Sequence, residues 1–373
     1  ERTSKLTRNF VDARGYWLPN DYTKHGVINE YTACREKAVL IDLSSLRKFE
    51  ILGPDAEELM DYTLTRNVKK LSVGQIVYSS MCYENGSMFD DGTLLKMSDH
   101  GFRWVCGDEY AGEWLKEQAK KKKFNVLVKN STDQINNISL QGPNSRKILE
   151  KFIFTPPTQP SISELQWFRF TICRVKELSG IPLMVSRTGY TGELGYEIWC
   201  HPSDAPAVWD VLMEAGKDEG LIPAGFGALD LLRIEAGLIL FGNEFDGQVD
   251  PFEAGVGFTV PLKTKTADFI GKEALIKRKE NPQKKLVGLE LVGKEKANHG
   301  DCVHIGRSQV GVVTSGCLSP TLNKNIALCR IDVGHSEIGM NVEVGKIDGH
   351  QKRIPAKVVG FPHYDPQKTR VKS

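Results

Sequence analysis

Acidic side chains close to glycine and aromatic residues are the groups in this sequence best suited to chemistry. Asp90 and Asp91 follow a turn at 84–87 and precede a run of strand-forming residues. Glu197 lies in segment 186–198, which also holds three glycines and two tyrosines. A positioned carboxylate can move a proton, and glycines let the backbone approach a flat ligand closely. These residue types favour a site built from two acidic segments.

Each segment also has a purely structural interpretation. Segment 186–198 fits an exposed hairpin whose carboxylates are only solvated. Asp90 and Asp91 fit an acidic turn; in a strand, where side chains alternate, only one of them can face a cavity. Arg233 interrupts an apolar helical pattern, and either Asp230 at i,i+3 spacing or a ligand would supply its partner. The residues alone leave these alternatives open.

Several other chemistries are poorly supported. The eight cysteines are scattered singly, which favours reduced thiols, and Cys317 has no histidine in a recognisable partner motif. Cys302 and His304 lack a second ligand pair at zinc spacing, so no metal site is predicted. No glycine loop of a nucleotide-binding type is present. Lysines 120–123 fit a solvated helix face, or a dock for an acidic partner or the acidic tail of a ligand.

Composition limits the class of protein. A chain of 373 residues exceeds one core, so two or three domains are expected. Lys and Arg total 49 against 47 for Asp and Glu. The resulting net charge of +2 does not indicate a nucleic-acid partner. The most apolar stretch, 221–242, contains Asp230, Arg233 and Glu235, so we expect no membrane span and a cytoplasmic or mitochondrial-matrix location.

A strand, a Gly-Pro turn and a helix start occur twice. Residues 48–52 alternate like a strand, Gly53-Pro54 turns the chain, and Asp55 is placed to accept hydrogen bonds from the first amides of a helix. Residues 137–145 repeat the pattern, by duplication or by chance.

The rest of the chain predicts an α+β protein. Between 184 and 258 strands alternate with helices at 205–215 and 228–238. After a charged stretch at 277–285 come short β-rich runs separated by Gly and Pro turns, at 286–291, 309–314, 325–331 and 354–359. A small C-terminal barrel fits these runs.

Taken in order, the segments resemble the T-protein, or aminomethyltransferase, family of the glycine cleavage system and its folate-binding relatives. The resemblance covers nearly the whole chain and rests on segments 41–46, 90–91, 140–143, 188–197, 232–237, 242–243 and 314–320. It implies three domains around a folate channel: a discontinuous α+β lobe of residues 1–48 and 137–275, a second α+β lobe of 49–136, and a C-terminal β-barrel of 285–373.

The resemblance also implies roles for particular residues. Asp91 would be the catalytic acid beside the nitrogens that receive the carbon. Glu197 would accept hydrogen bonds from the pterin, an aminopyrimidinone whose adjacent N–H groups suit a carboxylate. The other folate-binding positions implied are Tyr190, Arg233, Phe258 and Leu46.

The implied activity is transfer of an aminomethyl group from a lipoylated H-protein to tetrahydrofolate, with release of ammonia. The alternatives are a tetrahydrofolate-dependent demethylase of a small methylated amine or sulfonium, such as dimethylsulfoniopropionate, and a non-catalytic folate-binding protein. Departures from the family pattern at Leu43, Ser45, Leu46, Gly92 and 106–109 line the donor side of the channel, so they bear on the donor and not on folate.

Overall fold

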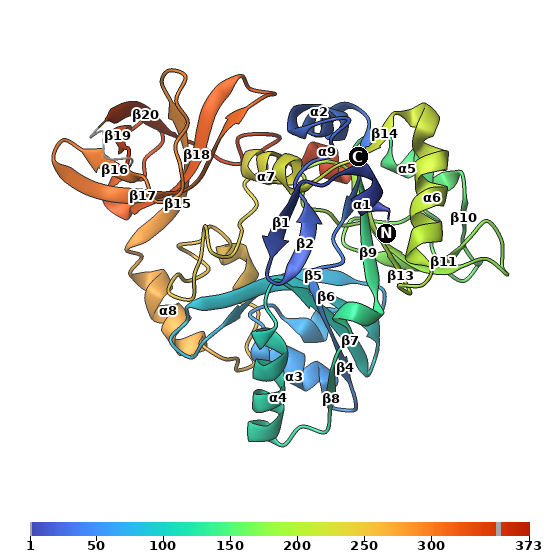
Figure 1. Ribbon diagram of the computed structural model, residues 1–373. Helices are drawn as coiled ribbons and strands as arrows, with labels where there is room; N and C mark the ends of the chain where they lie inside the picture. The colour runs from blue at the N-terminus through green and yellow to red at the C-terminus, as the bar shows by residue number, and fades with distance from the viewer. Residues whose placement is uncertain (1, 348–351) are drawn as a thin grey trace.

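A seven-stranded sheet is the largest element of the computed structural model, which describes residues 2–347 and 352–373 (Figure 1). Adjacent strands in this sheet run antiparallel, except that β3 and β14 at one edge run parallel. In spatial order the strands are β10 (Ile153–Phe154), β11 (Phe170–Val175), β12 (Pro182–Ser186), β13 (Gly195–Cys200), β9 (Asn136–Gln141), β3 (Ala38–Asp42) and β14 (Leu221–Pro223).

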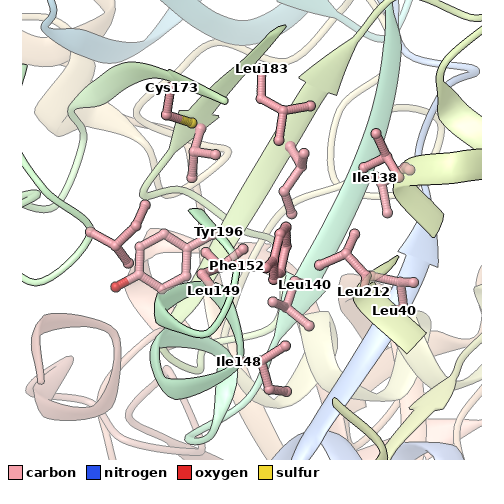
Figure 2. Packing of buried hydrophobic residues seen from close by; sticks show 14 of the residues in the cluster. Leu40, Ile138, Leu140, Ile148, Leu149, Phe152, Cys173, Leu183, Tyr196 and Leu212 are labelled. Carbon is pink, nitrogen blue, oxygen red and sulfur yellow. The ribbon is translucent and has the colours of Figure 1, made fainter. Parts of the chain in front are cut away.

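One face of this sheet packs on two helices, α5 (Ser145–Glu150) and α6 (Ala205–Gly216). Alternate strand residues, such as Leu140 on β9 and Tyr196 on β13, point into this core, which also contains Leu212 of α6 (Figure 2). The residues between them on each strand must therefore point to the opposite face.

A five-stranded sheet is built in the same way. Its order is β5 (Ile76–Cys82), β6 (Met88–Ser98), β7 (Gly101–Cys106), β4 (Arg47–Leu52) and β8 (Leu127–Asn130). One face packs on α3 (Ala56–Thr63) and α4 (Tyr110–Lys122) through a core that includes Phe49, Leu94 and Trp104.

The uncovered faces of the two sheets meet each other. Trp199 of β13 and Met184 of β12 join Leu95 of β6, Val105 of β7 and Ile76 of β5 in one buried cluster. We call the region between these two faces the inter-sheet layer. Any side chain in register with these residues projects into the same layer.

The C-terminal part is a closed barrel, as the β-rich runs predicted. Its order is β15 (Lys284–Leu291), β18 (Lys324–Asp332), β17 (Ser308–Ser319), β16 (Cys302–Ile305), β19 (Asn341–Gly345) and β20 (Arg353–Val359). Strands β16 and β19 were not among the predicted runs. The predicted α+β class with a small barrel is confirmed.

The remaining elements connect these three bodies. The hairpin of β1 (Phe10–Ala13) and β2 (Tyr16–Pro19) is a separate two-stranded sheet, and α7 (Phe226–Glu235) contacts α2 (Val27–Glu36) and β17 of the barrel. The other elements are α1 (Thr3–Leu6), α8 (Lys272–Glu280), α9 (Thr369–Lys372), and the 3-10 helices η1 (Val68–Lys70), η2 (Thr132–Gln134), η3 (Lys217–Glu219), η4 (Gly257–Thr259) and η5 (Val333–His335). Within the described ranges, no helix has the length and apolar character needed to span a membrane.

The repeated strand, turn and helix unit occurs once in each sheet, as β4 with α3 and as β9 with α5. Both turn glycines have positive φ, 137° at Gly53 and 121° at Gly142, and a Cβ there would lie 2.5 Å and 2.6 Å from a backbone oxygen. The predicted capping by Asp55 is wrong. Its carboxylate makes no cap hydrogen bond and instead accepts one from the Asn125 amide at 2.7 Å, because the loop at 125 lies against the turn.

The predicted lobe boundaries at 48, 136 and 285 fall close to the ends of strands, whereas the boundary at 275 lies inside α8. The boundary at 48 lies inside β4, and the boundary at 136 coincides with the first residue of β9. The division into folding units at 1–48 with 137–275, 49–136 and 285–373 stays a prediction.

Candidate active site

Asp91 lies on β6 and projects into the inter-sheet layer. It pairs with Ser80 of β5, and the pairs Tyr78–Thr93 and Ile76–Leu95 follow at steps of two residues. Side chains two residues apart on a strand share a face, and Ile76 and Leu95 belong to the inter-sheet cluster. The Tyr78 hydroxyl donates to Oδ2 of Asp91 at 2.6 Å. Desolvation raises the pKa of Asp91 to about 6, although the Tyr78 hydrogen bond and the charge of Arg14 both lower it.

Asp90 points to the other face of β6 and is completely buried. Its Oδ1 accepts hydrogen bonds from the amides of Asp91 at 2.9 Å and Gly107 at 3.3 Å, and its Oδ2 accepts one from the Asp108 amide at 3.2 Å. Burial and the neighbouring Asp91 raise its pKa to about 7. Asp90 therefore holds the adjacent ends of β6 and β7 together. Asp91 is the acid of the pair that faces the inter-sheet layer. The pair lies within a strand, so the acidic-turn interpretation is wrong.

Glu197 lies on β13 and faces the same layer as Trp199, two residues further along. Its Oε1 accepts a hydrogen bond from Nδ2 of Asn137 at 3.2 Å, and its Oε2 accepts one from the Thr188 hydroxyl. Burial raises the pKa of Glu197, while these two donors and the charge of Lys48 lower it. The carboxylate is thus held by hydrogen bonds from two uncharged side chains, Asn137 and Thr188, and Lys48 is the nearby cation.

The strand faces bring the two acids into one layer. The register row through Glu197 runs from Ser186 to Ser139, and all three residues are buried polar groups on the face opposite the helices. Asp91 occupies the facing sheet. The two carboxylates make no direct contact with each other, and Trp199 and Leu95 of the shared apolar cluster lie on the strands that carry them.

Loop 187–194, between β12 and β13, is largely buried, so the exposed-hairpin interpretation is wrong. Thr191 is completely buried, and Glu193 receives Arg35 at 3.1 Å, Arg370 at 2.7 Å and the Tyr364 hydroxyl at 2.8 Å. Tyr190 of this loop donates its hydroxyl to the Ile239 carbonyl. Burial raises the pKa of Tyr190, the charge of Arg233 lowers it, and the charge of Asp91 raises it.

Arg233 on α7 has its guanidinium largely committed to protein partners. It contacts Asp230 at 2.8 Å, Glu244 at 2.9 Å and Ser315 of the barrel at 2.9 Å, and it is 1% exposed. The i,i+3 pairing with Asp230 is therefore present. The predicted role of Arg233 in holding folate stays a prediction, whereas its contacts tie α7 to the barrel.

Phe258 and Leu46 occupy different environments. The ring of Phe258 in η4 is 61% exposed, and its centroid lies 6.1 Å from that of Tyr78. Leu46 is half-buried against both the inter-sheet cluster and the cluster that contains Tyr190. Its carbonyl accepts a hydrogen bond at 2.6 Å from Nζ of Lys48, whose pKa burial lowers to about 8.

Four residues near these acids were not predicted as site residues: Tyr78, Asn137, Lys48 and Arg14. Asn137 and Lys48 stand in strand patterns that the sequence reveals, but the pattern does not say which face is functional. Tyr78 and Arg14 carry no local signal, because their importance arises only when β5 and the β1–β2 hairpin pack beside β6.

Family models match most of the chain. Residues 1–264 match the GCVT N-terminal domain, and residues 284–365 match the glycine cleavage T-protein C-terminal barrel domain. The chain belongs to the glycine cleavage T-protein family. The family resemblance drawn from the sequence is confirmed.

A solved T-protein has the same fold. The glycine cleavage system aminomethyltransferase T from Bartonella henselae superposes with a TM-score of 0.86 at 26% identity, covering 98% of this chain and 96% of that one. An aminomethyltransferase from Symbiobacterium thermophilum is 40% identical over 96% of this chain and 94% of its own length.

A second kind of relative is more similar in sequence. A trimethylamine-oxide aldolase from Ruegeria pomeroyi is 57% identical over 100% of this chain. The chain spans only 47% of that relative's length. The relatives of this chain therefore include enzymes with two different activities, an aminomethyltransferase and an aldolase.

Proposed function

We propose that this chain transfers a one-carbon unit at the oxidation level of formaldehyde onto tetrahydrofolate, giving methylenetetrahydrofolate. The observation that carries the proposal is the pair of carboxylates, Asp91 and Glu197, which face one layer from two sheets and have different partners. Glu197 is suited to hold a ring and Asp91 to handle a proton. Tetrahydrofolate, when bound, supplies the two nitrogens that accept the carbon.

The residues around Glu197 fit a pterin. Oδ1 of Asn137 is buried and has no hydrogen-bond partner among the described residues. Each oxygen of Glu197 accepts one protein hydrogen bond and retains capacity for another. An aminopyrimidinone presents adjacent N–H donors, which would satisfy the free acceptor positions of both side chains. The unmatched Asn137 oxygen is thus support for a ligand with N–H groups at this place.

Asp91 fits a proton acceptor at neutral pH. With a pKa of about 6, it is about 90% ionised at pH 7. An acid so close to neutrality accepts a proton from an amine that is losing it and returns the proton to a leaving group. The Tyr78 hydroxyl holds the ionised carboxylate in place at 2.6 Å.

The donor that we propose is formaldehyde derived from a small methylated amine. The support is the 57% identity with a trimethylamine-oxide aldolase over the whole chain, compared with 40% for an aminomethyltransferase. Cleavage of one C–N bond of trimethylamine oxide gives a secondary amine and releases the methyl carbon as formaldehyde, so the atoms balance without an added oxidant. The two N–H bonds of the acceptor and the C=O bond are replaced by two C–N bonds and one water, without oxidation or reduction.

A second candidate donor is the aminomethyl group of a lipoylated H-protein. Its support is the match to aminomethyltransferases over nearly their full length and the TM-score of 0.86 with a T-protein. An aminomethyl group is also at the formaldehyde oxidation level. It would give the same folate product, with ammonia in place of water.

The test compares donors directly. The chain is incubated with tetrahydrofolate and one donor at a time: ¹³C-formaldehyde, aminomethyl-loaded H-protein, a methylated amine or a sulfonium. The folate product is identified by mass spectrometry against the uncatalysed reaction. We expect methylenetetrahydrofolate from formaldehyde at a rate well above background. Formation from the H-protein alone would support the second donor. A methyl product from a methylated amine or sulfonium, or no product from any donor, would contradict the proposal.

A further inference from the structure

The β1–β2 hairpin carries a cation toward Asp91. Arg14 stands at its turn with a positive φ of 55°, followed by Gly15 at 86°. The hairpin is fixed from both sides of the turn: Nη2 of Arg47 donates to the Arg14 carbonyl at 2.8 Å, and the Tyr16 hydroxyl donates to Asp133 at 2.7 Å. Its turn is therefore held against the five-stranded sheet.

The guanidinium of Arg14 has few partners of its own. Nη1 lies 3.5 Å from Oδ2 of Asp108, and the guanidinium carbon lies 4.5 Å from the ring centroid of Phe241. Both side chains of the ion pair are 36% exposed, so the pair contributes little to stability. A guanidinium has five N–H donors, and among residues 2–347 and 352–373 the guanidinium of Arg14 makes only this one long hydrogen bond.

Gly107 makes room for this guanidinium. A Cβ at Gly107 would lie 3.0 Å from Nη1 of Arg14 and 3.5 Å from Oδ1 of Asp90. Gly107 and Asp108 directly follow β7, which pairs with β6. The cation therefore lies beside the strand that carries Asp91.

The charge of Arg14 reaches Asp91. It lowers the pKa of Asp91 against the desolvation that raises it, together with the Tyr78 hydroxyl, whereas Glu244 acts in the opposite direction. Asp90 and Asp108 are the other acids beside this cation. Contacts connect the same groups: the Arg14 guanidinium lies over the ring of Phe241, Phe241 and Tyr78 pack against one apolar cluster, and the Tyr78 hydroxyl donates to Asp91 at 2.6 Å. The free donors of Arg14, the ring of Phe241 and the carboxylate of Asp91 therefore border one small region.

We infer that Arg14, Asp91 and Phe241 form the donor subsite, and that Arg14 selects an uncharged, oxygen-bearing one-carbon donor, formaldehyde or its hydrate. The inference rests on the proposed function. N–H donors of Arg14 point to an oxygen that gains negative charge as the C=O bond breaks, which is where fixed donors lower a barrier most. The oxygen leaves as water with the two amine protons. A sulfonium centre offers these N–H donors no oxygen acceptor.

The test uses Arg14→Ala and Arg14→Lys, with Arg307→Ala as the matched control. Arg307 is an exposed arginine beside the turn of the β16–β17 hairpin in the barrel, far along the chain from the acids. We expect Arg14→Ala to lower kcat/KM for formaldehyde by at least tenfold, while the folate Kd stays within twofold. Methylguanidine should restore part of the lost rate. Arg14→Lys should keep the pH midpoint of the rate but recover only part of kcat/KM.

Two results would overturn the inference: kcat/KM of Arg14→Ala within twofold of the parent, or parallel loss of folate affinity and rate with no rescue by methylguanidine. A readout without substrate separates this inference from the proposed function. The Asp91 carboxyl is titrated by ¹³C NMR in the folate-free chain and assigned with Asp91→Asn. Arg14→Ala should raise its pKa. If that shift appears but the parent chain makes no product from formaldehyde, the proposed function fails while the position of Arg14 stands; if product forms and neither rate nor pKa responds, the subsite inference fails.

Discussion

Asp90 and Asp91 are adjacent in sequence and have opposite surroundings. Asp90 accepts three backbone amides and is completely buried, whereas Asp91 is partly exposed in the inter-sheet layer and accepts one tyrosine hydroxyl. Strand alternation predicted that only one of them could face a cavity. It could not say which, because that depends on the face that packs on α3 and α4. The assignment to Asp91 came from the family resemblance.

Replacing Asp91 separates binding from chemistry. Asp91→Asn keeps the shape of the side chain and removes its proton-accepting charge. We expect turnover to fall by about 10²–10⁴-fold, the range for loss of a positioned acid or base, with folate affinity unchanged. Single-turnover kinetics and calorimetry measure the two quantities. Equal loss of affinity and turnover would point to a purely binding role.

The pH dependence of the rate reports on Asp91. Because the ionised carboxylate is the active form, kcat/KM should rise with pH through an apparent pKa of about 6. The Tyr78 hydroxyl stabilises that ionised form, so Tyr78→Phe should move the midpoint to higher pH. A profile that is flat from pH 5 to 8, or a midpoint that moves down in Tyr78→Phe, would rule out Asp91 as the titrating group.

Glu197 is the predicted anchor of the pterin. Glu197→Ala should weaken folate binding by about 2–4 kcal/mol, since paired donors of the ligand would be stranded in a desolvated place. Calorimetry measures the change, and Glu290→Ala on the exposed side of the barrel is the control. Affinity within error of the parent would remove Glu197 from the pterin site.

At the scale of elements, the sequence predicted β4, β9, α3, α6 and the principal barrel strands from periodicity and turn residues. It did not predict β16 or β19, which are only four and five residues long, nor the contact of the Asp55 carboxylate with Asn125. Local sequence patterns indicate helices and strands. They do not indicate that the amide of Asn125, 70 residues further along the chain, donates to the Asp55 carboxylate in place of the helix amides.

Helix α7 shows why Arg233 was ambiguous from sequence. The residue pairs with Asp230 on its own helix, which is a local pattern, and with Glu244 and Ser315, which are not. The second set makes it a connection between α7 and the barrel. An arginine at this position of the helix could contact folate or support the fold, and the sequence looks the same in both cases. Only the residues that Arg233 contacts in the structure distinguish the two roles.

Arg233→Ala should therefore destabilise the fold. Removing one partner of a buried pair strands Glu244, which is completely buried, and we expect a loss of about 3–5 kcal/mol. Asp230→Ala is the matched control, because Asp230 has a side chain that is 37% exposed and its loss should cost far less. Urea unfolding monitored by circular dichroism measures both. Full stability combined with lost folate binding in Arg233→Ala would instead favour direct ligand contact.

At the scale of the whole molecule, the candidate site depends on two sheets that each cover one face with helices and turn their other faces toward each other. Glu197 and Asp91 reach the same layer from strands far apart in the chain, and the β1–β2 hairpin adds Arg14 from a third segment. Composition and periodicity could predict the sheets but not their docking, since docking depends on which faces remain uncovered. The family resemblance implied that arrangement, which the residues alone could not.

The most direct test of the central claim is a crystal structure of this chain with tetrahydrofolate bound. We predict that pterin N–H groups lie within hydrogen-bond distance of Glu197, and that the edge bearing the two acceptor nitrogens faces Asp91. A folate bound elsewhere, or bound with Asp91 on the far side of the sheet from those nitrogens, would contradict the account.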